Sequence, residues 1–142
     1  MNEPQAELPT RSSDLSELEC YELLGTTTVG RIAFAAGNGI KVLPVNYRLL
    51  GRDIYYRTSR DGTLALALGS DVVAFEVDFH STVFATGWSV LLNGKVVPMD
   101  DRELEHLDPR HRPIPWATGD RDLHCRFVPN SVSGRQVRRP AS

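Results

Sequence analysis

Four residues near the middle of the chain carry side chains that are well suited to hold an anion. Arg57, Thr58 and Ser59 are consecutive, and Thr63 follows them directly behind Gly62. A guanidinium offers a planar, two-nitrogen contact to phosphate or carboxylate, and the three hydroxyls can donate further hydrogen bonds. A helix that begins near Gly62 would add backbone N–H groups and a favourable dipole. The side chains of this stretch therefore suit an anionic group such as a phosphate or a carboxylate.

The element that must position Arg57 is a predicted β-hairpin over residues 40–59. Two runs rich in Val, Leu, Ile and Tyr flank Gly51 and Arg52, and a leading glycine suits a two-residue type II′ turn. That turn sets Leu50 opposite Asp53. The same register extended along both strands pairs Leu49 with Ile54, Tyr47 with Tyr56, Asn46 with Arg57, and Val45 with Thr58.

Alternation of side chains along the two strands sorts the hairpin into an apolar face and a polar face. A slip of one residue in the register would exchange the two faces. The apolar set, predicted to face the core, is Val45, Tyr47, Leu49, Ile54, Tyr56 and Thr58. The polar set is Pro44, Asn46, Arg48, Tyr55, Arg57 and Ser59.

Composition indicates one ordinary globular domain. A chain of 142 residues with 41% hydrophobic residues can bury a core but leaves no room for a separate substrate domain. The net charge of -2 provides no positive field for nucleic acid. The two cysteines, Cys20 and Cys125, form no disulfide framework and no metal-ligand spacing. Without a signal peptide or a long apolar run, the sequence predicts a cytoplasmic protein.

The N-terminal part predicts a mobile tail over residues 1–13 and then a helix. Ser16 suits the N-cap and Glu19 completes a capping box. Leu18, Tyr21 and Leu24 share one helical stripe, and Gly25 suits the end of the helix.

The rest of the chain predicts an antiparallel barrel with peripheral helices. Strands are expected at residues 29–35, 72–79, 87–99 (kinked at Asn93-Gly94) and 123–129, with an edge strand at 132–137. Short helices are expected at 62–68 and 100–107, an irregular loop at 108–122, and a tail at 138–142. In the first strand, alternation sets Gly30 and Ile32 on one face and Arg31 on the other. In the strand at 72–79 the apolar face is Val73, Phe75, Val77 and Phe79. The folded domain is thus predicted over residues 14–137.

Five segments in this order, VGRIAF, PVNY, YYRT, AFEVD and GWSV, resemble the pyridoxamine 5′-phosphate oxidase-like proteins. They are most similar to the small bacterial branch that includes nitroimidazole-resistance-type proteins. The resemblance runs over residues 15–137. It implies a mainly β (α+β) fold, an antiparallel split β-barrel of about six to seven strands that binds FMN at a homodimer interface. Some branches use a deazaflavin, haem or no cofactor instead.

The resemblance also implies a set of cofactor-binding residues. Residues on the first hairpin strand would run along the isoalloxazine ring, with backbone groups bonding the ring edge, namely Pro44, Val45, Asn46 and Tyr47. Trp88 and Ser89 would lie around the ring, in part from the second subunit. The phosphate would be held by Arg57, Thr58, Ser59 and Thr63. Arg126 and Trp116 lie in the region where related oxidases place cofactor or substrate contacts.

Simpler roles remain open for several of these residues. Arg57 can pair with a surface carboxylate, Asn46 can bond a cross-strand neighbour, and Trp88 can anchor the core or a dimer interface. Relatives usually carry a lysine after the Gly-Thr that opens the short helix, where this chain has Leu64. That change removes one phosphate-binding charge. Either Arg57 or Arg60 compensates for it, or flavin binding is weak or absent.

The resemblance implies an FMN-dependent oxidoreductase that exchanges electrons with a small molecule. The flavin would carry the chemistry, so no catalytic acid or base is named, and the histidines show no metal-ligand spacing. Non-catalytic flavin or haem binding, or use of a deazaflavin, is the alternative on the same fold. The partner implied is a second copy of the chain. The sequence does not identify the substrate.

Overall fold

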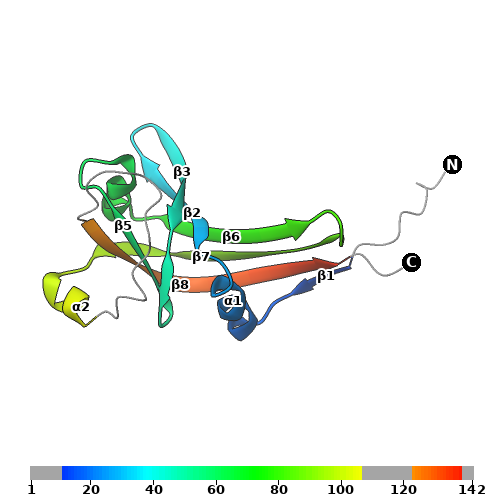
Figure 1. The fold of residues 1–142 in the computed structure, drawn as a ribbon. Coiled ribbons are helices and arrows are strands. Elements are labelled where there is room, and N and C mark those ends of the chain that lie inside the picture. The colour runs from blue at the N-terminus through cyan, green and yellow to red at the C-terminus, as the bar shows by residue number, and fades with distance from the viewer. Residues whose placement is uncertain (1–10, 107–122, 139–142) are drawn as a thin grey trace.

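One antiparallel sheet makes up most of the molecule. The computed structural model describes residues 11–106 and 123–138, so the predicted loop at 108–122, with Trp116, lies outside the described residues. The strand order is β3-β2-β6-β7-β8-β5-β4, and β1 pairs with β8 beside this path (Figure 1). The strands are β1 (Arg11–Asp14), β2 (Val29–Ala36), β3 (Gly39–Asn46), β4 (Arg48–Leu50), β5 (Asp53–Thr58), β6 (Val73–Ser81), β7 (Thr86–Pro98) and β8 (Leu123–Arg138).

In residues 11–106 and 123–138, three short helices accompany the sheet, namely α1 (Glu17–Leu24), the 3-10 helix η1 (Thr63–Gly69) and α2 (Asp101–Glu105). The long strands β6, β7 and β8 run side by side toward one end, while β2, β3 and β5 gather at the other (Figure 1). The predicted split β-barrel with short peripheral helices is confirmed. Within the described ranges, no helix is long and apolar enough to cross a membrane.

The core lies on the inner face of the curled sheet. Alternate residues of the strands are buried there, and Tyr47 packs edge-on against Phe75 with ring centroids 5.2 Å apart. The Tyr47 hydroxyl donates a hydrogen bond of 2.7 Å to the Leu24 carbonyl, which ties α1 to the barrel. The apolar face predicted for the hairpin is inward as expected. Of the predicted apolar face of β6, Phe79 is 54% exposed and does not belong to the core.

The start of α1 was predicted correctly, and its buried stripe was predicted in part. Ser16 and Glu19 form the capping box, with bonds of 3.1 Å and 2.9 Å. Of the predicted stripe, Leu24 is buried and Tyr21 packs partly against the core, whereas Leu18 is 71% exposed; Cys20 is buried in addition. Cys20 packs closely against Gly134 of β8. A Cβ added at Gly134 would lie only 2.6 Å from the Cys20 sulfur.

The predicted hairpin register holds only next to the turn. Arg48, Leu49 and Leu50 pair with Tyr55, Ile54 and Asp53. Beyond Arg48 the prediction is wrong, because β3 pairs with β2 and β5 pairs with β8. The strands part at Tyr47, whose backbone N–H donates to the Thr28 carbonyl at 2.8 Å.

The C-terminal part of the sheet also differs from expectation. Residues 132–137, predicted as an edge strand, belong to the single 16-residue strand β8, where they pair with β7 and, from Arg135 on, also with β1. Residues 11–13, predicted as tail, form part of β1 and pair with β8. Pro129 is tolerated within β8 because it lies opposite Gly94, where the predicted kink in β7 is a register shift.

Candidate functional site

The residues predicted to bind a cofactor fall into three sets in the structure. The first set faces the core, because Val45, Tyr47 and Thr58 are 6%, 1% and 1% exposed. Only backbone groups at these positions can reach a ligand. Trp88 packs partly against the same core, in agreement with the simpler role of a core anchor.

The second set lies on the outer face of the sheet. Pro44 and Asn46 flank buried Val45 on β3, and Ser89 precedes buried Val90 on β7. Since neighbouring residues of a strand point to opposite faces, all three side chains share the outer face. Ser89 and Trp88 also line an open groove of about 540 Å³ beside the turn between β6 and β7.

The third set lies at the end of β5 and the start of η1. Arg57 is opposite His124 of β8, on the outward side of β5. Ser59 and Thr63 flank a turn in which the Gly62 N–H donates to the Ser59 carbonyl at 3.1 Å. Leu64, at the position where relatives carry lysine, packs against the core, so this position contributes no charge.

Two further residues of the region have well-defined partners. Tyr55, predicted on the outward polar face, is fully buried against Met99, and its hydroxyl lies 2.5 Å from His124 Nδ1. Arg126, which the resemblance places near cofactor or substrate, lies 3.3 Å from the Glu103 carboxylate of α2. Both are therefore engaged in packing α2 against the sheet.

Along β8, Arg57 of the third set and Ser89 of the second set are far apart. Arg57 pairs with His124 near the start of β8, and Ser89 pairs with Arg135 near its end. These two positions of β8 are eleven residues apart, or about 36 Å along the strand. One chain thus presents Arg57 and Ser89 near opposite ends of its longest strand.

The outer face between Pro44 and Ser89 carries three charged residues that were not predicted as site residues. Arg31 on β2 lies opposite Pro44 on one side and opposite Glu76 of β6 on the other. Asp78, two residues after Glu76, lies opposite Ser89. The span from β3 to β7 covers three strand spacings, about 14 Å. The charged residues therefore lie among the predicted ring contacts.

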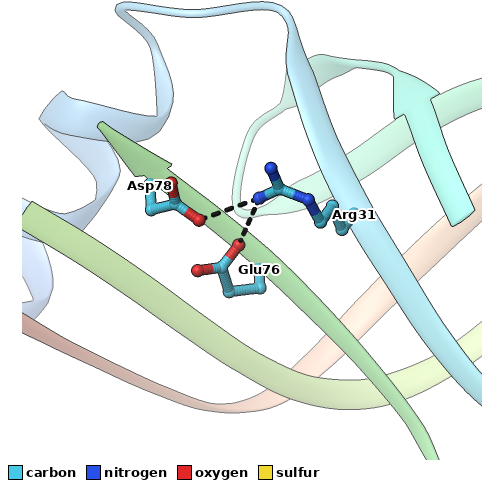
Figure 2. A network of polar contacts seen from close by, with 3 residues as sticks. All are labelled: Arg31, Glu76 and Asp78. Atoms are coloured by element: carbon cyan, nitrogen blue, oxygen red, sulfur yellow. Dashed lines mark hydrogen bonds and ion pairs between the residues drawn. The ribbon is translucent and has the colours of Figure 1, made fainter. Parts of the chain in front are cut away.

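These three side chains form one polar cluster (Figure 2). Arg31 Nη1 donates to Glu76 Oε1 at 3.2 Å and to Asp78 Oδ2 at 2.8 Å. The side chains are 56%, 34% and 40% exposed, respectively, so the cluster is open to solvent. Arg31, Pro44 and Asp78 line a small hollow of about 270 Å³ together with Thr27, Val29 and Gly30.

The two carboxyl groups of the cluster titrate differently. Partial burial and the neighbouring Asp78 raise the pKa of Glu76 to about 7, although Arg31 opposes this shift. The hydrogen bond with Glu76 and the Arg31 charge lower the pKa of Asp78. Near neutral pH, Asp78 is ionised and Glu76 is partly protonated. The cluster can therefore hold a proton on the Glu76 carboxyl group.

A sequence signal for this cluster existed but was incomplete. Alternation along the first strand sets Arg31 outward. On β6, Glu76 lies between buried Phe75 and Val77, and Asp78 follows Val77. The missing information was the pairing of β2 with β6, which joins segments 45 residues apart. Within the described residues, no cluster of three or more His, Cys, Asp or Glu side chains could hold a metal ion.

The fold alone defines a class, the split β-barrels of mainly antiparallel strands with short helices at the periphery. A sequence model of the family described as pyridoxamine 5′-phosphate oxidase matches residues 16–136, most of the chain. The protein belongs to this family, as its sequence segments predicted.

Individual relatives agree with this assignment. The structure of the FAD binding protein from Mycobacterium smegmatis is 30% identical with a TM-score of 0.73, covering 87% of this chain and 98% of that one. A FAD-binding protein from Mesorhizobium loti has a TM-score of 0.75 at 22% identity, covering 91% and 98% of the two chains, and shows the fold alone. An uncharacterized protein of Mycobacterium tuberculosis is 26% identical over 131 residues, which are 87% of this chain and 84% of that relative.

Proposed function

We propose that the protein is a flavin-dependent oxidoreductase that binds FMN between two copies of the chain. The observation that carries the proposal is the gathering of Pro44, Asn46 and Ser89 on one face of the sheet, across strands β3 to β7. These are the positions that the family resemblance assigns to the ring. When bound, the flavin would accept and return electrons, and the protein would supply position and electrostatics.

The residues present fit the ring portion of a flavin. The strand order ends at β3, so no other described strand pairs with its far side. An edge strand presents unpaired N–H and C=O groups, and these can bond the polar rim of the ring. Backbone contact is the only kind available from buried Val45 and Tyr47, and it is the kind that the resemblance implies.

The phosphate would be held by Arg57, Ser59 and Thr63, with exposed Arg60 close by in the chain. Their charge and hydroxyls suit a phosphate, whereas Leu64 contributes none. Because this group and Ser89 lie at opposite ends of β8, we propose that a complete site takes its two ends from different subunits.

A second copy is also the partner that the exposed surface supports. The turn between β6 and β7 presents Val83 and Phe84, which are 84% and 76% exposed, and Phe79 lies nearby on β6. Large apolar side chains gathered at one surface mark an interaction site. A two-fold related copy would cover them and bring its own outer face to the site.

FAD is a second candidate for the cofactor. It is favoured by the 30% identical FAD binding protein from Mycobacterium smegmatis. Haem or a deazaflavin, and binding without catalysis, remain the alternatives. Oxidation of reduced nicotinamide by the flavin-loaded protein in the presence of an electron acceptor supports the enzyme, and a bound flavin without turnover supports the binding protein.

The test of the site is an Arg57→Ala variant. A charge-assisted hydrogen bond contributes about 1.5–3 kcal/mol, so we expect FMN affinity to fall by about 10- to 100-fold while the protein still elutes as a dimer. Fluorescence titration with FMN and with FAD gives the affinities, and gel filtration gives the assembly. Arg52→Ala, an ion-paired surface arginine on the turn after β4, is the control. Unchanged affinity in Arg57→Ala would remove Arg57 from the site.

A further inference from the structure

Arg31 occupies the centre of the outer face on which the flavin ring is proposed to lie. It is cross-strand partner both to Pro44 of β3 and to Glu76 of β6. Its side chain is 56% exposed and lines the hollow of about 270 Å³ that also includes Pro44. A ligand that follows the outer face from β3 to β7 must therefore pass the Arg31 guanidinium.

The hydrogen bonds of Arg31 leave one edge of the guanidinium available. Both carboxylates bond the same atom, Nη1, at 3.2 Å and 2.8 Å (Figure 2). Nε and Nη2 make no hydrogen bond to any residue in the described part of the chain. These two atoms form a planar edge that suits two acceptor atoms side by side.

The charge of the cluster limits the kind of ligand. One guanidinium faces two carboxyl groups, so the cluster carries no net positive charge at any pH at which Asp78 is ionised. It would not attract a phosphate, which needs an excess of positive charge. A neutral acceptor pair is better suited, and an oxidised flavin ring is uncharged and carries carbonyl oxygens next to ring nitrogens.

We propose that Arg31 is a further residue of the flavin site, whose Nε and Nη2 donate paired hydrogen bonds to a carbonyl and an adjacent nitrogen of the ring. Glu76 and Asp78 are positioning residues. They stand two residues apart on β6, on the same face, and hold the guanidinium from one side. This inference rests on the proposed function and adds a residue that contacts the ring rather than the phosphate.

The test compares the affinities of three variants for FMN and for FAD by fluorescence titration. Arg31→Met removes both donors, and we expect affinity to fall by about 10- to 100-fold, the loss of a charge-assisted pair. Arg31→Lys keeps the charge and the ion pairs but has no two-nitrogen edge, so we expect most of the same loss in a protein that folds normally. Asp78→Asn should weaken binding less, because Glu76 still holds the guanidinium.

Two controls separate the possible results. Arg52→Met removes an ion-paired arginine elsewhere on the surface and should bind flavin like the wild type. Thermal unfolding of each apo variant measures any purely structural role. If Arg31→Met and Arg31→Lys bind flavin as tightly as the wild type, Arg31 only stabilises the sheet through its ion pairs and the inference is wrong. Wild-type protein that binds neither FMN nor FAD would overturn the proposed function and this inference together.

Discussion

At the scale of single residues, the structure changes which side chains form the candidate site. Arg57 and its hydroxyl neighbours were the first residues predicted to bind a ligand, because an arginine beside Thr and Ser is visible in one short segment. Arg31, Glu76 and Asp78 lie in two distant segments, and only the pairing of β2 with β6 brings them within 3.2 Å. The grouping of Arg57 with its hydroxyl neighbours was therefore visible in the sequence, whereas the long-range cluster was not, and the role of Arg57 stays a prediction.

The Glu76 pKa predicts how stability depends on pH. Glu76 has a pKa of about 7 in the folded chain against 4.5 for a free glutamate. Between these values the folded state binds more protons than the unfolded state, so this group lowers the free energy of unfolding as pH rises through that window. Glu76→Gln removes the effect, so its Tm relative to the wild type should increase between about pH 5 and about pH 8.

Thermal unfolding of both proteins at the two pH values makes the comparison. Glu22→Gln is a suitable control, because Glu22 is exposed on α1 and lies outside the cluster. A Tm difference that stays constant with pH, or that decreases toward alkaline pH, would contradict a raised Glu76 pKa.

At the scale of elements, turns and local patterns were predictable and strand partners were not. The capping box of α1, the β4–β5 turn and the kink in β7 each depend on a few adjacent residues, and all were predicted correctly. The predicted hairpin pairs β3 with β5, whereas in the structure β3 pairs with β2. Which of these pairings forms depends on which strands meet across the barrel. No local signal distinguishes these pairings when every strand is apolar on one face.

The kink in β7 yields a prediction about backbone packing. A Cβ at Gly94 would lie 2.1 Å from the Val128 carbonyl oxygen and 2.8 Å from Pro129 Cα. Because both atoms belong to the backbone of β8, they cannot move aside as a flexible side chain would. Gly94→Ala should therefore lower the free energy of unfolding by about 1–3 kcal/mol, as measured by chemical denaturation.

A matched strand glycine controls for the loss of backbone freedom. A Cβ at Gly39 of β3 would have no heavy atom within 4 Å beyond its chain neighbours, so Gly39→Ala should change stability little. Equal stability of the Gly94→Ala and Gly39→Ala variants would show that β7 and β8 do not approach each other as closely as described.

At the scale of the whole molecule, the distribution of exposed apolar residues points to an assembly. Val83 and Phe84 lie at the turn between the long strands β6 and β7, at the end of the molecule away from η1 (Figure 1). In a monomer they would remain in water. In the proposed dimer they contact the second copy, beside the groove lined by Trp88 and Ser89.

This arrangement predicts that Phe84→Ser weakens the dimer. A buried phenylalanine at an interface contributes about 1.5–3 kcal/mol, so the dissociation constant of the dimer should rise by about 10-fold or more. Analytical ultracentrifugation over a concentration series measures it. Leu18→Ser, at a similarly exposed leucine of α1, is the control. A dimer of unchanged affinity would show that this turn lies outside the interface.

The central claim is that the outer face of β3, β2, β6 and β7 holds a flavin. Its most direct test is the near-ultraviolet and visible absorbance spectrum of freshly purified protein, followed by addition of FMN and FAD to any colourless fraction. We predict the two-band spectrum of a bound flavin, either as purified or after titration to one flavin per chain. A haem or deazaflavin spectrum, or protein that remains colourless with both flavins, would contradict the claim.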